Sequence, residues 1–259
     1  MREAGLRQAI EAAGGVRALA RQLGVSQPTV SGWRRVPADR VLAVESLTGV
    51  DRAVLRPDIY PPQDAAAADV DPIDMARAEE YALLAALLWR APGQDLLDRL
   101  ARLRGDGSEI GMAHLALADA ATGTDAEAVS REFFDLFIGL GRGEILPYAS
   151  YYLTGFLHER PLAVLRGDLA RLGIERAERV AEPEDHIAIL CETMAGLIRC
   201  DFGVAGLGER EFFARHMEPW AGRLFADLET SRAGRFYRAV GTLGRAMMEI
   251  EAEAFALPA

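Results

Sequence analysis

Residues 182–197 read EPEDHIAILCETMAGL, which combines a helix start signal with the face that the helix would bury. Proline is favoured in the first turn of a helix, and carboxylates such as those of Glu184 and Asp185 are favoured near its positive end. Apolar residues then recur at helical spacing: Ile187, Leu190, Cys191, Met194, Leu197 and Ile198. The sequence therefore predicts a helix that begins at about Glu182 and buries a single apolar stripe.

The same helical period extends through the chain on both sides of this stretch. EEYALLAALLWRAP (79–92) predicts an apolar helix that stops before its proline, and a capping box, TDAE at 124–127, opens a helix that runs through Leu140. FFARHMEPWAGRLFADLE (212–229) continues the pattern. We find no sustained alternation of apolar and polar residues of the kind that indicates a strand. We therefore predict an all-α protein in which residues 74–259 form a helical bundle.

Charge and proline content divide the chain into two parts. All 29 basic residues are arginines, because the chain contains no lysine. Residues 1–57 carry a net charge of +4 and residues 58–259 a net charge of −14, which together give the −10 of the whole chain. PDIYPPQDAAAADVDP (57–72) holds four prolines, which block helix interiors. We predict two domains, at 1–57 and 74–259, joined by a Pro/Ala-rich linker at 58–73, and the charge asymmetry suggests different partners for them.

VRALARQLGVSQPTVSGWRR (16–35) predicts a helix-turn-helix. One face of its first helix carries the apolar residues Val16, Leu19, Ala20 and Leu23. Gly24 suits the left-handed position that ends a helix, and Ser26 is a good N-cap for the next one. Val30 and Trp33 would face the core from this second helix. In such a motif the second helix enters the major groove of DNA.

This segment, with VPADRVLAVESLTGV (36–50) after it, resembles the Cro/YdaS-like helix-turn-helix family of antitoxins and repressors over about 6–60. The resemblance implies binding of duplex DNA, often as a homodimer, with a recognition helix at about 27–35. The residues that we expect to reach phosphates or base edges are Ser26, Gln27, Thr29, Ser31, Arg34 and Arg35. A decayed or purely protein-binding helix-turn-helix is the alternative, because Pro28 and Gly32 occupy exposed positions where related repressors often carry base-reading side chains.

Motifs of catalysis and metal binding are missing from the sequence. It lacks the G-x-S-x-G and H-E-x-x-H patterns, and without lysine it has no Walker-type phosphate loop. The glycines at 139–143 follow a predicted helix and not a strand, so they indicate an interhelical loop. Cys191 and Cys200 are too far apart for a paired metal site. Asp185 and His186 could act as an acid–base pair, but no nucleophile accompanies them. We predict no enzymatic activity, no cofactor and no metal.

EFFDLFIGLGRGEILPYASYYLTG (132–155) and EPEDHIAILCETMAGL (182–197) resemble the paired motifs of the TorD family of redox-enzyme maturation chaperones. The similarity extends over about 76–255. It implies an all-helical fold without a cofactor, which binds the twin-arginine signal peptide of a molybdoenzyme precursor before export. A formate-dehydrogenase-like catalytic subunit is the client that we expect. Carried over position by position, the peptide site comprises Tyr148, Ser150, Tyr152, Glu182, Asp185 and His186.

Simple physical chemistry agrees with this expectation. A twin-arginine signal is a cationic head followed by an apolar run, so its receptor should offer carboxylates beside an apolar, aromatic groove.

No apolar stretch of the chain is long enough for a signal peptide or a membrane span, and we expect a cytoplasmic protein. The alternative is a transcriptional regulator whose helical domain senses a ligand or a client.

Overall fold

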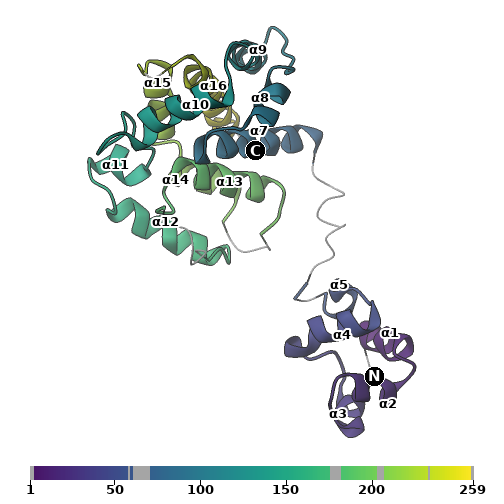
Figure 1. Ribbon diagram of the computed structural model, residues 1–259. Helices are drawn as coiled ribbons and strands as arrows, with labels where there is room; N and C mark the ends of the chain where they lie inside the picture. The colour runs from purple at the N-terminus through teal and green to yellow at the C-terminus, as the bar shows by residue number, and fades with distance from the viewer. Residues whose placement is uncertain are drawn as a thin grey trace. The chain divides into compact units, whose positions relative to one another are not determined.

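The computed structural model describes residues 3–57, 59–60, 71–175, 182–202, 207–232 and 234–257, apart from the side chain of Asp39. The chain divides into two compact units, Met1–Val70 and Asp71–Ala259 (Figure 1). Throughout the described residues the regular structure is helical, and one bridge between Tyr148 and His186 is the only β-type pairing there. The all-α prediction is therefore confirmed. Most of the predicted linker at 58–73 lies outside the described residues.

Short helices form the Met1–Val70 unit. They are α1 (Ala4–Ala12), α2 (Val16–Gln22), α3 (Gln27–Gly32), the 3₁₀ turn η1 (Ala38–Arg40), α4 (Val41–Thr48) and α5 (Arg52–Leu55). Gly24, with φ +67°, turns the chain between α2 and α3. Ser26 caps α3, because its hydroxyl accepts a hydrogen bond from the Thr29 amide at 3.3 Å. Leu19 and Val30 are fully buried where the two helices meet. The helix-turn-helix geometry is thus present as predicted.

The second helix of this pair is shorter than the sequence suggests. It ends at Gly32, whereas the prediction continued it to Arg35. Trp33 leaves the helix in an extended conformation and packs against both apolar clusters of the unit. Arg34 and Arg35 consequently lie on the segment after the helix and not on it. Packing of one indole against the core has here outweighed the local helical preference.

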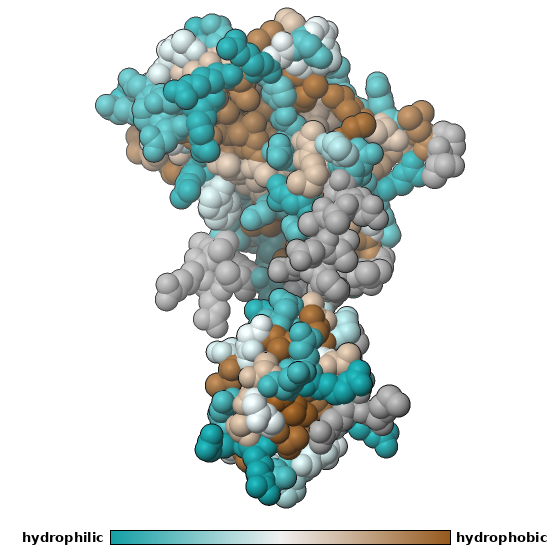
Figure 2. All heavy atoms as spheres, turned by 90° about the vertical axis from the view of Figure 1, so that its right-hand side faces the viewer, coloured by the Kyte–Doolittle hydropathy of each residue, from teal (hydrophilic) through white to brown (hydrophobic). Residues whose placement is uncertain are grey.

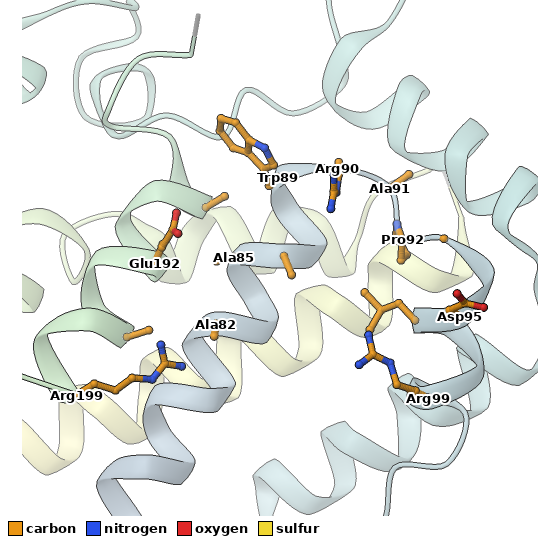
Figure 3. A pocket seen from close by; sticks show the side chains of 15 residues that line it. Ala82, Ala85, Trp89, Arg90, Ala91, Pro92, Asp95, Arg99, Glu192 and Arg199 are labelled. Carbon is orange, nitrogen blue, oxygen red and sulfur yellow. The ribbon is translucent and has the colours of Figure 1, made fainter. Parts of the chain in front are cut away.

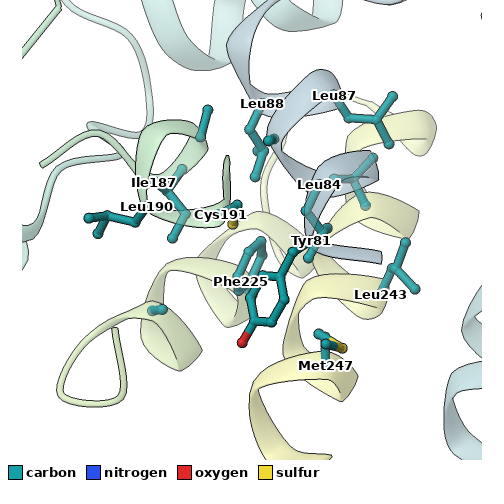
Figure 4. Close-up of a cluster of buried hydrophobic side chains, with 14 of the residues drawn as sticks. Tyr81, Leu84, Leu87, Leu88, Ile187, Leu190, Cys191, Phe225, Leu243 and Met247 are labelled. Carbon is teal, nitrogen blue, oxygen red and sulfur yellow. The ribbon is translucent and has the colours of Figure 1, made fainter. Parts of the chain in front are cut away.

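A larger helical assembly forms the Asp71–Ala259 unit. Its first helices are α7 (Pro72–Trp89), α8 (Gln94–Leu100), α9 (Glu109–Thr122), α10 (Ala126–Phe133) and the π-helical turn η2 (Phe134–Ile138). They are followed by α11 (Ala149–Thr154), α12 (Arg160–Arg171), α13 (Ile187–Ile198), α14 (Glu209–His216), α15 (Ala221–Glu229) and α16 (Arg235–Ala256). Helix α7 packs along α13, and α16 packs on both α15 and α9. Figure 4 shows the side chains that meet there, among them Tyr81, Leu84, Leu190, Phe225 and Leu243.

Two glycines let α15 approach α16 closely. A Cβ atom on Gly244 would lie 2.1 Å from the ring of Phe225, and one on Gly241 would lie 2.6 Å from the backbone nitrogen of Glu229. Both distances are far below van der Waals contact, so a larger side chain would push the two helices apart. Glycine within this 22-residue helix therefore has a packing role that offsets its low helix propensity.

A buried ion pair joins the first and last helices of this unit. The Arg77 guanidinium donates to both carboxylate oxygens of Glu251, from Nε at 2.7 Å and from Nη2 at 2.8 Å. Glu251 is fully buried and also accepts a hydrogen bond from the Tyr81 hydroxyl at 3.2 Å. These hydrogen bonds raise the pKa of Arg77 above its usual value, against the effect of burial, so Arg77 stays protonated.

Two predicted helix starts are displaced. Helix α13 begins at Ile187 with His186 as its N-cap, and not at Glu182. Helix α10 is capped by the side chain of Asp125, not by Thr124. Its continuation η2 ends at Ile138, so the next apolar residue, Leu140, is 98% exposed instead of buried. The 79–92 prediction is confirmed, because α7 ends at Trp89.

Several large apolar side chains are solvent-exposed on the surface of the Asp71–Ala259 unit. Figure 2 shows hydrophobic residues gathered between hydrophilic ones on one of its faces. Exposed fractions reach 70% for Phe156 and 46% for Val164. Among the described residues, however, no helix combines the length and the hydrophobicity needed to cross a bilayer.

Candidate functional site

The two motifs at 132–155 and 182–197 meet at one backbone junction. The amide of Ala149 donates to the carbonyl of Asp185 at 3.0 Å, and the amide of Ile187 donates to the carbonyl of Pro147 at 2.9 Å. This pairing forms the bridge between Tyr148 and His186. It holds 185–187 against the loop before α11, while the His186 amide donates to the Pro183 carbonyl at 3.1 Å and closes a turn at 183–186. The helix therefore starts later than its local sequence suggests.

Asp185 lies at the centre of the junction and is completely buried. Its Oδ2 accepts a hydrogen bond from the Ser150 amide at 2.8 Å. Its Oδ1 is buried without a hydrogen-bond partner among the described residues, and the same holds for the Oγ of Ser150. Unsatisfied buried polar atoms are rare and costly in native proteins, so the Asp185 oxygen is an acceptor that a donor from a ligand would satisfy.

Asp185 also lines a cavity of about 320 Å³ between α11, α12, α13 and α14. Its walls are largely apolar and include Leu153 on α11 and Val164 on α12, both more than two-fifths exposed. Arg160 and Arg215 contribute guanidinium groups to the lining. The cavity has the size and the apolar character of a small binding site with one acidic group in its wall.

His186 caps α13 and remains neutral. Its Nδ1 accepts a hydrogen bond from the Ala188 amide at 3.1 Å. Burial lowers the pKa of His186 to about 4, although Glu182 and Asp185 act in the opposite direction. Its ring lies edge-on to Tyr148, with centroids 5.1 Å apart, and to Trp89, with centroids 5.8 Å apart. His186 thus orders the junction as an uncharged ring.

Tyr148 connects this junction to a second carboxylate. Its hydroxyl donates to Glu182 Oε2 at 2.5 Å, and Glu182 is only partly buried. Burial, followed by the hydrogen bond to Glu182, raises the pKa of Tyr148 above its usual value. The hydroxyl is therefore a permanent donor, and it holds the Glu182 carboxylate in a fixed position.

Tyr152 points to a different site. Its hydroxyl donates to Asp227 on α15 at 2.7 Å, and the guanidinium of Arg223 lies 5.9 Å from its ring centroid. It lines another cavity, of about 310 Å³, together with Arg142 and Asp227. The structure thus brings together five of the six predicted peptide-site residues, namely Tyr148, Ser150, Glu182, Asp185 and His186, and separates Tyr152 from them.

A cluster around Asp168 borders the first cavity and was not predicted. Asp168 accepts hydrogen bonds from Arg171 at 3.0 Å, from Arg215 at 2.7 Å and from His216 Nε2 at 2.9 Å. Burial acts to raise the pKa of Asp168, but these donors outweigh it and the pKa is lowered. Burial also lowers the pKa of His216. Two of these partners are 47 and 48 residues away in sequence, so no local pattern could reveal the cluster.

A larger cavity, of about 600 Å³, opens on another face of α13, where that helix meets α7 and α8 (Figure 3). Its lining includes Ala82, Ala85 and Trp89 from α7, with Arg99 and Glu192 at the sides. None of the six predicted peptide-site residues is among the described residues that line it. Charges of both signs surround it, so its lining selects no ligand class.

All six predicted DNA-contacting residues are solvent-exposed in the Met1–Val70 unit: Ser26, Gln27, Thr29, Ser31, Arg34 and Arg35. The hydroxyl of Ser26 is engaged with Thr29, at 2.7 Å from its Oγ1, while it caps α3. The side chain of Gln27 accepts a hydrogen bond from Arg17 at 3.1 Å. The exposed side of α3 is therefore polar, and arginines lie on α2 and directly after α3.

Comparisons with known proteins match both units separately. A family model described as "Nitrate reductase delta subunit" matches residues 104–226, and one described as "Bacterial toxin YdaS" matches residues 6–64. The chaperone protein TorD of Shewanella loihica is 24% identical over 209 residues, which cover 72% of this chain and 96% of that protein.

Two further relatives have the same printed name. The TorD of Vibrio atlanticus is 30% identical over 145 residues, half of this chain and 67% of that protein. The TorD of Vibrio cholerae strain M66-2 is 30% identical over 101 residues, 36% of this chain and 46% of that protein. These relatives are named as chaperones and not as enzymes.

Proposed function

Since the chain belongs to the TorD family of chaperones, we propose that its Asp71–Ala259 unit binds the twin-arginine signal peptide of a molybdoenzyme precursor in the cytoplasm. Binding would hold the precursor until its cofactor is inserted and export can begin. A formate-dehydrogenase-like catalytic subunit is the client that we propose.

The observation that supports this most directly is the unsatisfied carboxylate of Asp185 in the wall of an apolar cavity. A guanidinium offers donors in a fork that matches a carboxylate, and the stem of an arginine is apolar. Leu153 and Val164 would contact the apolar run that follows the arginine pair. Both requirements of such a signal, a carboxylate and an apolar surface, are thus combined at one place.

Calorimetric titration of the full chain with a synthetic twin-arginine peptide tests the proposal. We expect binding that weakens about tenfold or more in Asp185→Asn, because a hydrogen bond to a charged group contributes about 1.5–3 kcal/mol. Glu127→Gln, which alters a carboxylate on the exposed side of α10, serves as the matched control and should bind normally. Equal affinity of Asp185→Asn and the control would place the peptide elsewhere.

For the Met1–Val70 unit we propose binding of duplex DNA as a homodimer, in which each copy reads one half-site. The supporting observation is the exposed, polar side of α3 with arginines next to it, in a part of the chain with a net charge of +4. An electrophoretic shift of the DNA upstream of the protein's own gene, with the full chain, tests this. A protein that binds no duplex at any salt concentration lacks this function.

A transcriptional regulator is the second candidate. The same chain carries a helix-turn-helix and the cavity proposed to bind the peptide, so occupancy of one could change the affinity of the other. Measuring DNA affinity with and without saturating peptide separates a regulator from a chaperone that also binds DNA. A change of about fivefold or more would favour the regulator, since coupling between sites is typically about 1–3 kcal/mol.

A further inference from the structure

Two carboxylates of the junction differ sharply in their surroundings. Asp185 is 0% exposed, lines the 320 Å³ cavity and has one oxygen without a partner among the described residues. Glu182, three residues earlier, is only partly buried and is held by the Tyr148 hydroxyl through one oxygen. One carboxylate thus lies buried in the wall of a cavity, and the other is partly exposed to solvent.

Resting on the proposed function, we propose that the two arginines of the signal peptide bind to two different carboxylates, one to Asp185 inside the cavity and the other to Glu182 at the surface. The protein would therefore distinguish the two arginines. It would require a guanidinium at one of the positions and accept any cation at the other.

The geometry of an extended peptide leads to this division. Successive side chains of an extended backbone point to opposite sides, so two adjacent arginines do not enter one cavity together. Asp185 and Glu182 are separated by at most about 11 Å of chain, because an extended residue spans about 3.3–3.6 Å. Two guanidinium groups that diverge from one dipeptide can reach two acceptors at such a separation.

The charges of the cavity also limit it to one guanidinium. Arg160 and Arg215 already contribute cations to its lining. Asp168 already accepts hydrogen bonds from Arg171, Arg215 and His216, so its charge is compensated within the protein. A second incoming cation would meet these like charges without a carboxylate of its own, which is unfavourable at short range.

The buried and the surface carboxylate should also differ in what they select. Asp185 lines the cavity, and its Oδ1 has no hydrogen-bond partner among the described residues; the same holds for the hydroxyl of Ser150, whose amide binds Asp185. Such a site suits the several donors of a guanidinium better than the single ammonium of lysine. At the surface, Glu182 interacts with a cation mainly by charge, and solvent replaces any donor that lysine lacks.

Binding of four peptides to the full chain tests the inference: the Arg-Arg peptide, the two peptides with lysine at either position, and the Lys-Lys peptide. We expect one single replacement to weaken binding at least tenfold and the other less than threefold. In Asp185→Asn, the lysine replacement that weakens binding to the wild type at least tenfold should weaken it less than threefold. In Glu182→Gln, the same replacement should still weaken binding at least tenfold. The inference would be overturned if the two single lysine replacements weakened binding to the wild type by amounts that agree within threefold. It would also be overturned if the larger of the two effects were unchanged in Asp185→Asn.

A second variant guards against misfolding of Asp185→Asn. Val164 lines the cavity and is 46% exposed, so Val164→Trp fills the cavity from its rim without altering the junction. We expect it to abolish the difference between the two lysine peptides. If the Arg-Arg peptide itself does not bind to the wild-type chain, the proposed function fails, and that result is distinct from binding with equal penalties.

Discussion

Ser150 and Asp185 are separated by 35 residues in sequence, yet the amide of Ser150 donates to a carboxylate oxygen of Asp185 at 2.8 Å. Two carbonyl–amide hydrogen bonds flank this contact and join the loop before α11 to the loop before α13. Asp185 therefore holds the junction through one oxygen, whereas its other oxygen has no hydrogen-bond partner among the described residues and is the one that we propose accepts the peptide's guanidinium. The two roles can be separated by substitution.

The structural role of Asp185 predicts different stabilities for two variants. Asp185→Asn keeps an oxygen acceptor for the Ser150 amide and should lower the free energy of unfolding by less than about 1 kcal/mol, whereas Asp185→Ala leaves a buried donor unpaired and should lower it by about 1–3 kcal/mol. Urea denaturation measures both. If Asp185→Asn destabilises as much as Asp185→Ala, the buried charge itself holds the junction together.

The ion pair between Arg77 and Glu251 predicts a strong non-additivity. Arg77→Met leaves Glu251 buried without its cation and should destabilise the Asp71–Ala259 unit by about 3–5 kcal/mol. Replacing both residues with methionine should recover most of that loss, because no buried charge remains. Thermal unfolding of the two single variants and the double variant measures the coupling. A double variant that is destabilised by the sum of the two single-variant effects would contradict this explanation.

The low pKa of His186 predicts a loss of stability in acid. Its pKa is about 4 in the folded protein, below its usual value of 6.5, so the unfolded chain takes up the proton first. Stability from this residue is complete above pH 6.5 and falls by about 3 kcal/mol as the pH drops to about 4. The lowered pKa of His216 adds a loss of the same sign.

His186→Asn isolates this contribution, because asparagine is a good N-cap and does not titrate. Urea denaturation at several pH values between 7 and 4 should show a shallower loss for the variant than for the wild type. Parallel curves for the two proteins would mean that His186 takes no part in the acid response.

The salt dependence of DNA binding tests which residues of the Met1–Val70 unit contact phosphates. If Arg34 and Arg35 each neutralise a phosphate, replacing both with alanine should weaken binding to every sequence and reduce the slope of log K against log salt by about 2. Gln27→Ala should instead weaken the preferred sequence by about 1–3 kcal/mol and leave nonspecific binding unchanged. Fluorescence anisotropy across salt concentrations separates the two effects. If the double alanine variant has the same slope as the wild type, neither arginine contacts a phosphate.

The sequence predicts best where local rules decide the structure. The turn at Gly24, the Ser26 cap and the buried Val30 all follow from short-range conformational preferences, and all are present. The start of α13 was misplaced for the opposite reason. Proline and carboxylates favour a helix from Glu182, but the chain forms a turn at 183–186 and His186 pairs with Tyr148, so the helix begins only at Ile187.

The site itself was predicted only through resemblance, and only in part. Neither spacing nor composition indicates that the Ser150 amide contacts Asp185. Tyr152 belongs to the same motif as Ser150, but its hydroxyl binds Asp227, and the peptide-binding role of all six residues stays a prediction. The Asp168 cluster has no sequence signal because its members come from α12 and α14. Such groups depend on tertiary packing, which residue patterns along the chain do not encode directly.

The contact between Trp89 and His186 makes the junction optically observable. The chain contains three tryptophans; Trp220 is buried, Trp33 belongs to the other unit, and Trp89 is 41% exposed against the His186 ring. An indole that is half in water shifts its emission when the polarity around it changes. Intrinsic fluorescence of the unlabelled protein would therefore report on the state of this junction, and Trp89→Phe would identify the signal.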